Sequence, residues 1–157
     1  MKRLKKIGYS LLLVLIIAQF FRPEKNDGDI TTVAHFLAET NPTENVKKIL
    51  ETTCFDSHSS TTTYPWCNSI TPVNYWLEEH IRDAKKHLNF SKWSEYSLKK
   101  KAHKMDELHE EVEEGEMPLN SYTWTHAEAN LSPIKTFAFV AWGKKVQADY
   151  KQLLNTK

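Results

Sequence analysis

The pattern of apolar and polar positions predicts helices along most of the chain. The most regular stretch covers residues 73–88, where apolar residues recur at every third or fourth position, as on one face of a helix. A second stripe covers residues 98–112, and Gly115 follows it at the usual place of a helix C-cap. Thr43 and the pair Ser132–Pro133 are typical starts of two further helices. The last helix is expected to turn five residues inward: Ile134, Phe137, Ala138, Ala141 and Trp142. No strand pattern of comparable length occurs, so the sequence predicts an all-α fold of four or five short helices after an N-terminal one.

The first 25 residues have the pattern of an export signal. Four basic residues lie within residues 1–6, and an apolar run covers residues 7–21. Arg22 then begins a polar segment, and no A-x-A-like cleavage site follows. We therefore expect a retained signal-anchor at residues 1–25 that crosses the inner membrane once through residues 7–21 and leaves the rest of the chain on the periplasmic side. A cleaved signal peptide and a buried core helix are the alternatives.

The remaining chain is interpreted as a linker followed by one domain. Residues 26–42 are polar and mixed, with some packing expected through Val33, Phe36 and Leu37, and residues 43–157 form the helical domain. Residues 26–157 carry 15 Lys or Arg against 19 Asp or Glu. This mildly acidic balance argues against a nucleic-acid partner, because such partners select strongly basic surfaces.

One short stretch suggests metal or cofactor chemistry. The run Cys54-Phe55-Asp56-Ser57-His58 differs at one position from C-x-x-C-H, the attachment motif of c-type haem. In that motif the two cysteines form thioethers with haem and the histidine binds the iron. Ser57 replaces the second cysteine, which leaves Cys54 as the one remaining tether in the motif. Taken alone, the spacing is weak, and a polar loop that happens to contain Cys and His is the simpler interpretation.

Met117 is a second candidate. It follows the predicted helix end at Gly115 and precedes Pro118. A thioether on such a constrained loop can reach an iron from the side opposite a histidine, although most methionines only fill cores. No G-x-S-x-G, Gly-rich phosphate loop or H-E-x-x-H occurs, so hydrolytic chemistry has little support. An electron carrier or binding domain is favoured over an enzyme.

The whole chain resembles a family of bacterial membrane-anchored haem-binding domains that are cytochrome-c-like in character. The landmarks of this resemblance are QFFRPEKN (19–26), NVKKILETTCFDSHSSTTTYPW (45–66), HLNFSKWSEYSLKKKAHKMDELHEEVEEGEMPLNSYT (87–123) and FVAWGKK (139–145). Such proteins usually carry a complete C-x-D-C-H-S motif followed by T-x-Y-P-W. The resemblance implies a haem cofactor with His58 as proximal ligand, Met117 as distal ligand and Cys54 as a thioether tether. It also implies electron transfer or haem-linked sensing.

This chain departs from the family pattern at Ser57 and at Cys67, where the family commonly has tyrosine. Three outcomes remain open: haem held by one thioether at Cys54, noncovalent haem with the same ligands, or a Cys54–Cys67 disulfide in a haemless interaction module. The loop of 14 residues from Cys54 to Cys67, both included, is short enough to close. A zinc site formed by Cys54, His58 and Cys67 is less expected, because it lacks a fourth ligand.

Two further expectations concern ligands and partners. If Met117 does not bind the iron, His87 or His109 would be the substitutes. The acidic residues of the segment 110–116 lie beside Met117. They are either a solvated helix face or a patch that orients a basic partner. In the second case we expect another redox protein to dock there.

Overall fold

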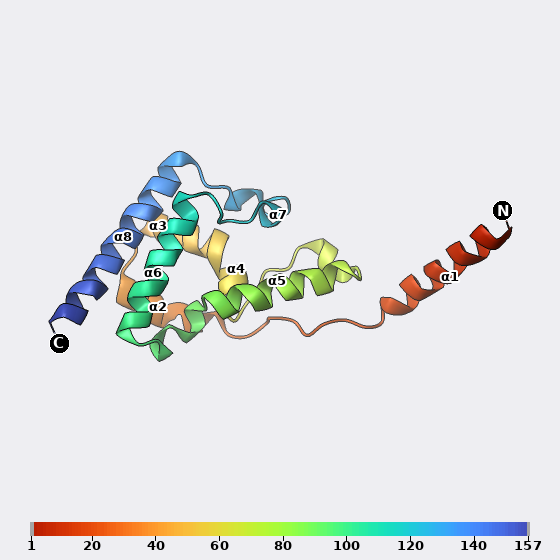
Figure 1. Cartoon of the computed structure of the whole chain (residues 1–157), viewed down its shortest axis with the longest axis horizontal. Coiled ribbons are helices and arrows are strands. Elements are labelled where there is room, and N and C mark those ends of the chain that lie inside the picture. Colours follow the sequence, from red (N-terminus) through yellow and green to blue (C-terminus); the bar gives the residue numbers. More distant parts are fainter. Residues whose placement is uncertain (1, 157) are drawn as a thin grey trace.

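Helices make up nearly all the regular structure of the computed structural model, which describes residues 2–156 (Figure 1). The α-helices are α1 (Lys2–Ala18), α2 (Ala34–Thr40), α3 (Glu44–Ile49), α4 (Phe55–His58), α5 (Val73–His87), α6 (Leu98–Glu113), α7 (Asn120–Thr123) and α8 (Pro133–Asn155). Shorter helical turns are Ile30–Val33, Leu50–Cys54, Trp66–Ser69, Phe90–Glu95 and Ala127–Ala129. The all-α prediction is confirmed. Seven α-helices follow α1 in the described chain rather than four or five, because helices of four to seven residues are too short to show a helical repeat.

Helices α6 and α8 begin at capping serines, and α6 ends just before the glycine that the sequence indicates. The Ser97 hydroxyl accepts from the backbone N–H of Lys100 at the start of α6, and the Ser132 hydroxyl accepts from that of Lys135 at the start of α8. Gly115 follows the end of α6 with φ of +78°, the left-handed conformation that glycine adopts without strain. After this turn the chain leaves the end of α6 and continues to α7 (Figure 1).

The buried face of α8 is set by its contact with α6. A Cβ atom built on Gly143 would lie 2.8 Å from the Cβ of His109, so the two helices approach one another very closely there. Trp142 is buried, as the sequence predicts. The expectation that Ile134 and Phe137 also face inward is wrong, since they are 82% and 76% exposed. The buried stripe is centred on Gly143 and consists of Phe139, Val140, Trp142, Val146 and Tyr150.

The centre of the core is a cluster of aromatic rings around Phe36 of α2. The ring centroid of Phe36 lies 4.5 Å from that of Phe90, 5.0 Å from that of Trp93 and 6.1 Å from that of Trp142. Both Phe36 and the preceding Val33 are buried. The stretch 26–42 therefore contains helical turns whose apolar side chains are part of the core.

The N-terminal helix α1 stands apart from this core (Figure 1). None of its residues is buried. Just beyond its end, the Gln19 side chain hydrogen-bonds the backbone N–H and carbonyl of Thr71, at 2.9 and 3.1 Å. Within residues 2–156, no helix is both long enough and apolar enough to cross a membrane.

Candidate functional site

His58 is the last residue of α4, a single turn that is fixed on both sides. The buried Phe55 ring lies 5.3 Å from that of Phe90, and this contact joins α4 to the aromatic core. The Asp56 carboxylate accepts from the Thr63 backbone N–H and from the Tyr122 hydroxyl, both at 2.9 Å. These contacts hold the turn and the loop after it, so the imidazole has a defined position.

The imidazole of His58 is prepared as a metal ligand. Its Nδ1 lies 3.0 Å from the backbone carbonyl oxygen of Leu88. Because a carbonyl can only accept a hydrogen bond, Nδ1 carries the proton and Nε2 keeps its lone pair. Burial lowers the pKa of His58, and the hydrogen bond to Leu88 opposes this only in part. The ring is therefore neutral at neutral pH, with Nε2 available to a metal.

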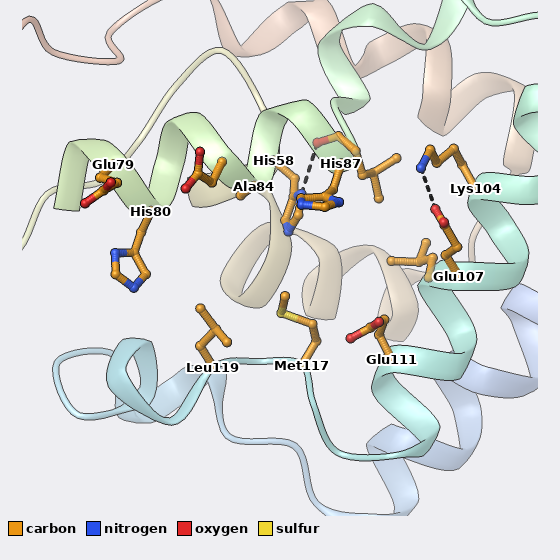
Figure 2. A pocket seen from close by; sticks show the side chains of 13 residues that line it. His58, Glu79, His80, Ala84, His87, Lys104, Glu107, Glu111, Met117 and Leu119 are labelled. Atoms are coloured by element: carbon orange, nitrogen blue, oxygen red, sulfur yellow. Dashed lines mark hydrogen bonds and ion pairs between the residues drawn. The ribbon is translucent and has the colours of Figure 1, made fainter. Parts of the chain in front are cut away.

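His58 faces a cavity of about 480 Å³ (Figure 2). This volume lies within the range of about 300–1,000 Å³ that is usual for sites of small molecules and cofactors. Helix α5 forms one wall, α6 another, and the segment after Gly115 a third. The lining residues are His58, Glu79, His80, Asp83, Ala84, His87, Leu88, Lys104, Glu107, Leu108, Glu111, Met117 and Leu119.

Met117 lines the same cavity from the other side. After the turn at Gly115, the backbone N–H of Met117 donates to the carbonyl of Glu111 at 3.0 Å, which ties this segment to the end of α6. Figure 2 shows Met117 and His58 approaching the cavity from opposite walls. The structure thus brings together the two residues that the sequence suggests as iron ligands.

The two cysteines lie elsewhere. Cys54 is 8% exposed within the hydrophobic core and does not line the cavity, and burial raises the pKa of its thiol to about 12. Cys67 is half-buried and lines a second cavity of about 220 Å³, together with Ser57. Both thiols are free, so the Cys54–Cys67 disulfide is not formed in this structure. Within residues 2–156, no group of His, Cys, Asp and Glu side chains is arranged to hold a zinc ion.

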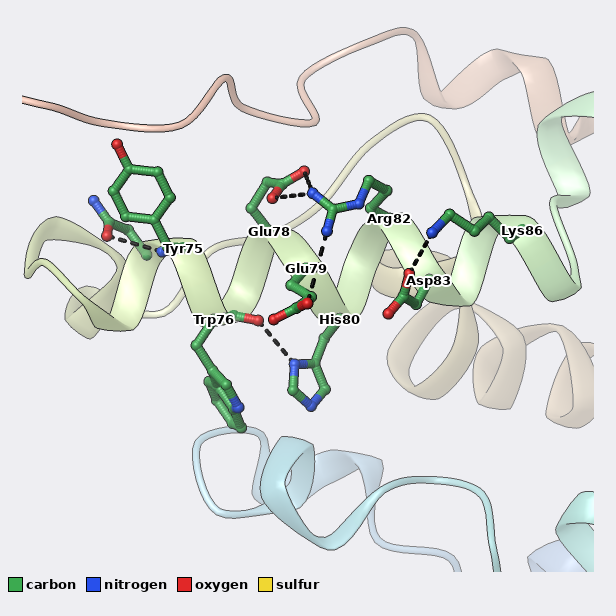
Figure 3. Close-up of polar contacts among 9 residues, drawn as sticks. Tyr75, Trp76, Glu78, Glu79, His80, Arg82, Asp83 and Lys86 are labelled. Carbon is green, nitrogen blue, oxygen red and sulfur yellow. Dashed lines mark hydrogen bonds and ion pairs between the residues drawn. The ribbon is translucent and has the colours of Figure 1, made fainter.

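Three other histidines differ in their relation to the cavity. His80 and His87 line it, and Nδ1 of His80 lies 2.8 Å from the Trp76 carbonyl (Figure 3). His80 is thus a half-buried residue at the edge of the cavity. His109 is buried against Gly143 between α6 and α8 and does not line the cavity. Of the two substitute ligands named from the sequence, only His87 lies at the site.

Sequence reasoning missed the α6 wall of the cavity. Lys104, Leu108 and Glu111 are spaced by four and three positions, so they share one face of α6. The apolar stripe of residues 98–112 was interpreted only as core. Lys104 and Glu111 add a polar edge to that stripe, and their spacing with Leu108 is the signal that could have located the wall.

The fold and the cavity define an all-α domain that offers an imidazole and a thioether to one bound group, a donor pair typical of haem proteins. The chain belongs to the haem-binding domain family, whose family model matches residues 13–145. No curated protein and no solved structure matches the chain. Haem is therefore its cofactor, and the donor set and the apolar residues around His58 and Met117 fit that group.

Proposed function

We propose that haem binds in the 480 Å³ cavity with Nε2 of His58 as proximal ligand and the sulfur of Met117 as distal ligand. The observation that carries this proposal is the position of the two side chains on opposite walls of one cavity (Figure 2). The hydrogen bond from His58 to Leu88 supports it further, because second partners of this kind orient a metal-binding imidazole.

The pair of ligands favours electron transfer or haem-linked sensing over catalysis. With two axial side chains, the site leaves no open position for a substrate. The bound group supplies a one-electron couple, and His/Met ligation raises its reduction potential. The chain itself holds the imidazole through Leu88 and lines the site with the apolar side chains of Leu108 and Leu119.

The attachment of haem is proposed to involve at most one thioether. Cys54 is the one cysteine of the motif, but its thiol is buried in the core and its pKa is raised to about 12. A thioether forms through an accessible sulfur, and thiol reactivity depends on the thiolate form. The buried thiol therefore supports noncovalent haem as the form held by the folded domain, with a Cys54 thioether requiring attachment before α4 closes over the sulfur.

Met117→Ala is expected to keep haem in the cavity but to change its coordination. Loss of the thioether leaves His58 as a single protein ligand, so the absorption spectrum changes from six-coordinate low-spin to high-spin, and the reduction potential falls. The measurement is the absorption spectrum and redox titration of the purified full chain. Glu116→Ala, an exposed neighbour outside the cavity, is the control. An unchanged spectrum and potential for the Met117 variant would exclude it as a ligand.

We also propose that residues 7–21 attach the protein to a membrane, with the domain on the periplasmic side. No described side chain of α1 is buried, and Leu11 and Val14 show 65% and 63% of their surface. Four basic residues precede this apolar stretch. Within residues 2–156 this apolar surface is not buried against the rest of the domain, and both lipid tails and anionic headgroups complement it.

A charge placed on α1 tests this attachment. The double change Leu12→Glu and Leu15→Glu is expected to move most of the protein from the membrane fraction to the supernatant, because carboxylates do not enter the apolar interior. Cell fractionation with immunodetection measures the distribution. Ile134→Glu is the matched control, since Ile134 is an apolar residue that is 82% exposed outside α1. The proposal is wrong if the unmodified chain, the double variant and Ile134→Glu all divide equally between the membrane fraction and the supernatant.

A further inference from the structure

The charges that line the cavity are distributed unevenly. Haem carries two propionate carboxylates that are ionised at neutral pH. The described lining residues include four acidic side chains, namely Glu79, Asp83, Glu107 and Glu111. Histidines aside, Lys104 is the single positively charged residue among them. The two propionates of haem in this cavity would therefore be repelled by four carboxylates and attracted by a single lysine.

Lys104 is a shielded cation with free hydrogen-bonding capacity. Its side chain is 13% exposed, and among the described residues its only hydrogen-bond partner is the Glu107 carboxylate. An ammonium group has three N–H donors, so two remain for a second anion. Glu107 is 45% exposed and also lies 3.2 Å from Nε2 of His103, which offers its carboxylate another partner on the surface. Lys104 can thus take up a new carboxylate without leaving Glu107 unpaired.

Apart from its histidines, the α5 wall offers a propionate no positively charged partner. The Glu79 carboxylate lies 3.8 Å from Arg82, and that of Asp83 lies 2.7 Å from Lys86 (Figure 3). Arg82 and Lys86 do not line the cavity, so these cations are held on the outer side of the helix. A propionate placed against this wall would face Glu79 and Asp83, while the cations that pair with them lie outside the cavity.

We infer that Lys104 binds a propionate of haem and thereby fixes the orientation of the porphyrin within the cavity. This inference rests on the proposed haem site. Figure 2 shows Lys104 at one end of the cavity and His80 and Glu79 at the other, with His87 between them beside His58. The propionate edge faces the Lys104 end, His87 is a second donor, and the vinyl edge faces His80 and Leu119.

Titration of the apo-protein with two porphyrins tests the inference. The full chain is produced without haem-attachment machinery and titrated with haem and with haem dimethyl ester, in which both propionates are neutral. Lys104→Gln is expected to weaken haem binding about tenfold, since a hydrogen bond to a charged group typically contributes at least that much. Binding of the ester should not change, and Lys104→Arg should restore most of the affinity for haem.

The control is Lys101→Gln on the same helix. The Lys101 side chain is also 13% exposed, but its ammonium contacts both oxygens of Glu39, at 2.8 and 2.7 Å, outside the cavity. This variant should bind both porphyrins as the unmodified chain does. The inference is overturned if Lys104→Gln binds haem normally, or if it loses affinity equally for haem and ester. If the unmodified chain binds neither porphyrin, the proposed haem site itself fails.

Discussion

Replacement of His58 by alanine is expected to weaken haem binding by at least about a hundredfold, because loss of an outer partner of a metal ligand alone typically lowers affinity by about 10–100-fold. The variant removes the proximal nitrogen and leaves Met117, a weak donor, to face the iron alone. Titration of the apo-protein, followed by absorbance, measures the affinity. The spectrum of any haem that binds should be that of a high-spin complex, and added free imidazole should restore a low-spin spectrum by occupying the space of the missing ring.

The variant His80→Ala is the control for His58→Ala, because it also removes one imidazole from the cavity but not the one proposed to bind the iron. His80 lines the same cavity, and its Nδ1 is also bonded to a backbone carbonyl, so Nε2 of both histidines is available. We expect His80→Ala to leave the affinity within about threefold of the original, because a contact at the porphyrin edge contributes much less than a bond to the iron. If His80→Ala abolished binding and His58→Ala did not, the two roles would have to be exchanged.

The sequence predicted the parts of the fold that have a long repeat or a strong cap. Helices α5 and α6 each present apolar residues over about four turns, so their helical period can be recognised from the sequence alone. Ser132 followed by Pro133 marked the start of α8. The positions of His58 and Met117 were suggested by a motif and by a loop after a helix end, and both side chains do line one cavity.

The remainder depends on contacts between distant segments. Helix α2 has seven residues, and only its burial against Phe90 and Trp93 shows that Phe36 belongs to the core. Likewise, the choice of the buried face of α8 follows from its close approach to α6 at Gly143, so that Phe137 remains outside. A local pattern contains neither piece of information.

The position of Cys54 has a similar cause. The turn Leu50–Cys54 is a π-helical turn, which adds a residue per turn and shifts the side chains that follow relative to a regular helix. Cys54 ends this turn within the core, whereas His58 extends toward the cavity. The spacing C-x-x-x-H alone gives both residues the same helical face and could not separate them.

Replacement of Phe36 by alanine is expected to destabilise the protein by about 3–5 kcal/mol, the usual range for removal of a fully buried aromatic side chain. Phe36 has no exposed surface, and its ring contacts those of Phe90, Trp93 and Trp142, which come from two other parts of the chain. The cavity left behind cannot close without moving all three. Denaturant unfolding of the full chain, followed by tryptophan fluorescence, gives the free energy of unfolding.

Phe137→Ala is the matched control, because the same side chain is removed where it is 76% exposed, and its effect should stay within about 0.5 kcal/mol. The comparison decides where the domain begins. A loss of stability at Phe36 no larger than that at Phe137 would mean that residues 26–42 are a linker, as their mixed composition suggests. A large loss should also weaken haem binding, since Phe90 connects Phe36 to Phe55 and to the His58 ring, whose centroid lies 6.2 Å from that of Phe90. The aromatic core would then be the structure that holds the proximal ligand in place.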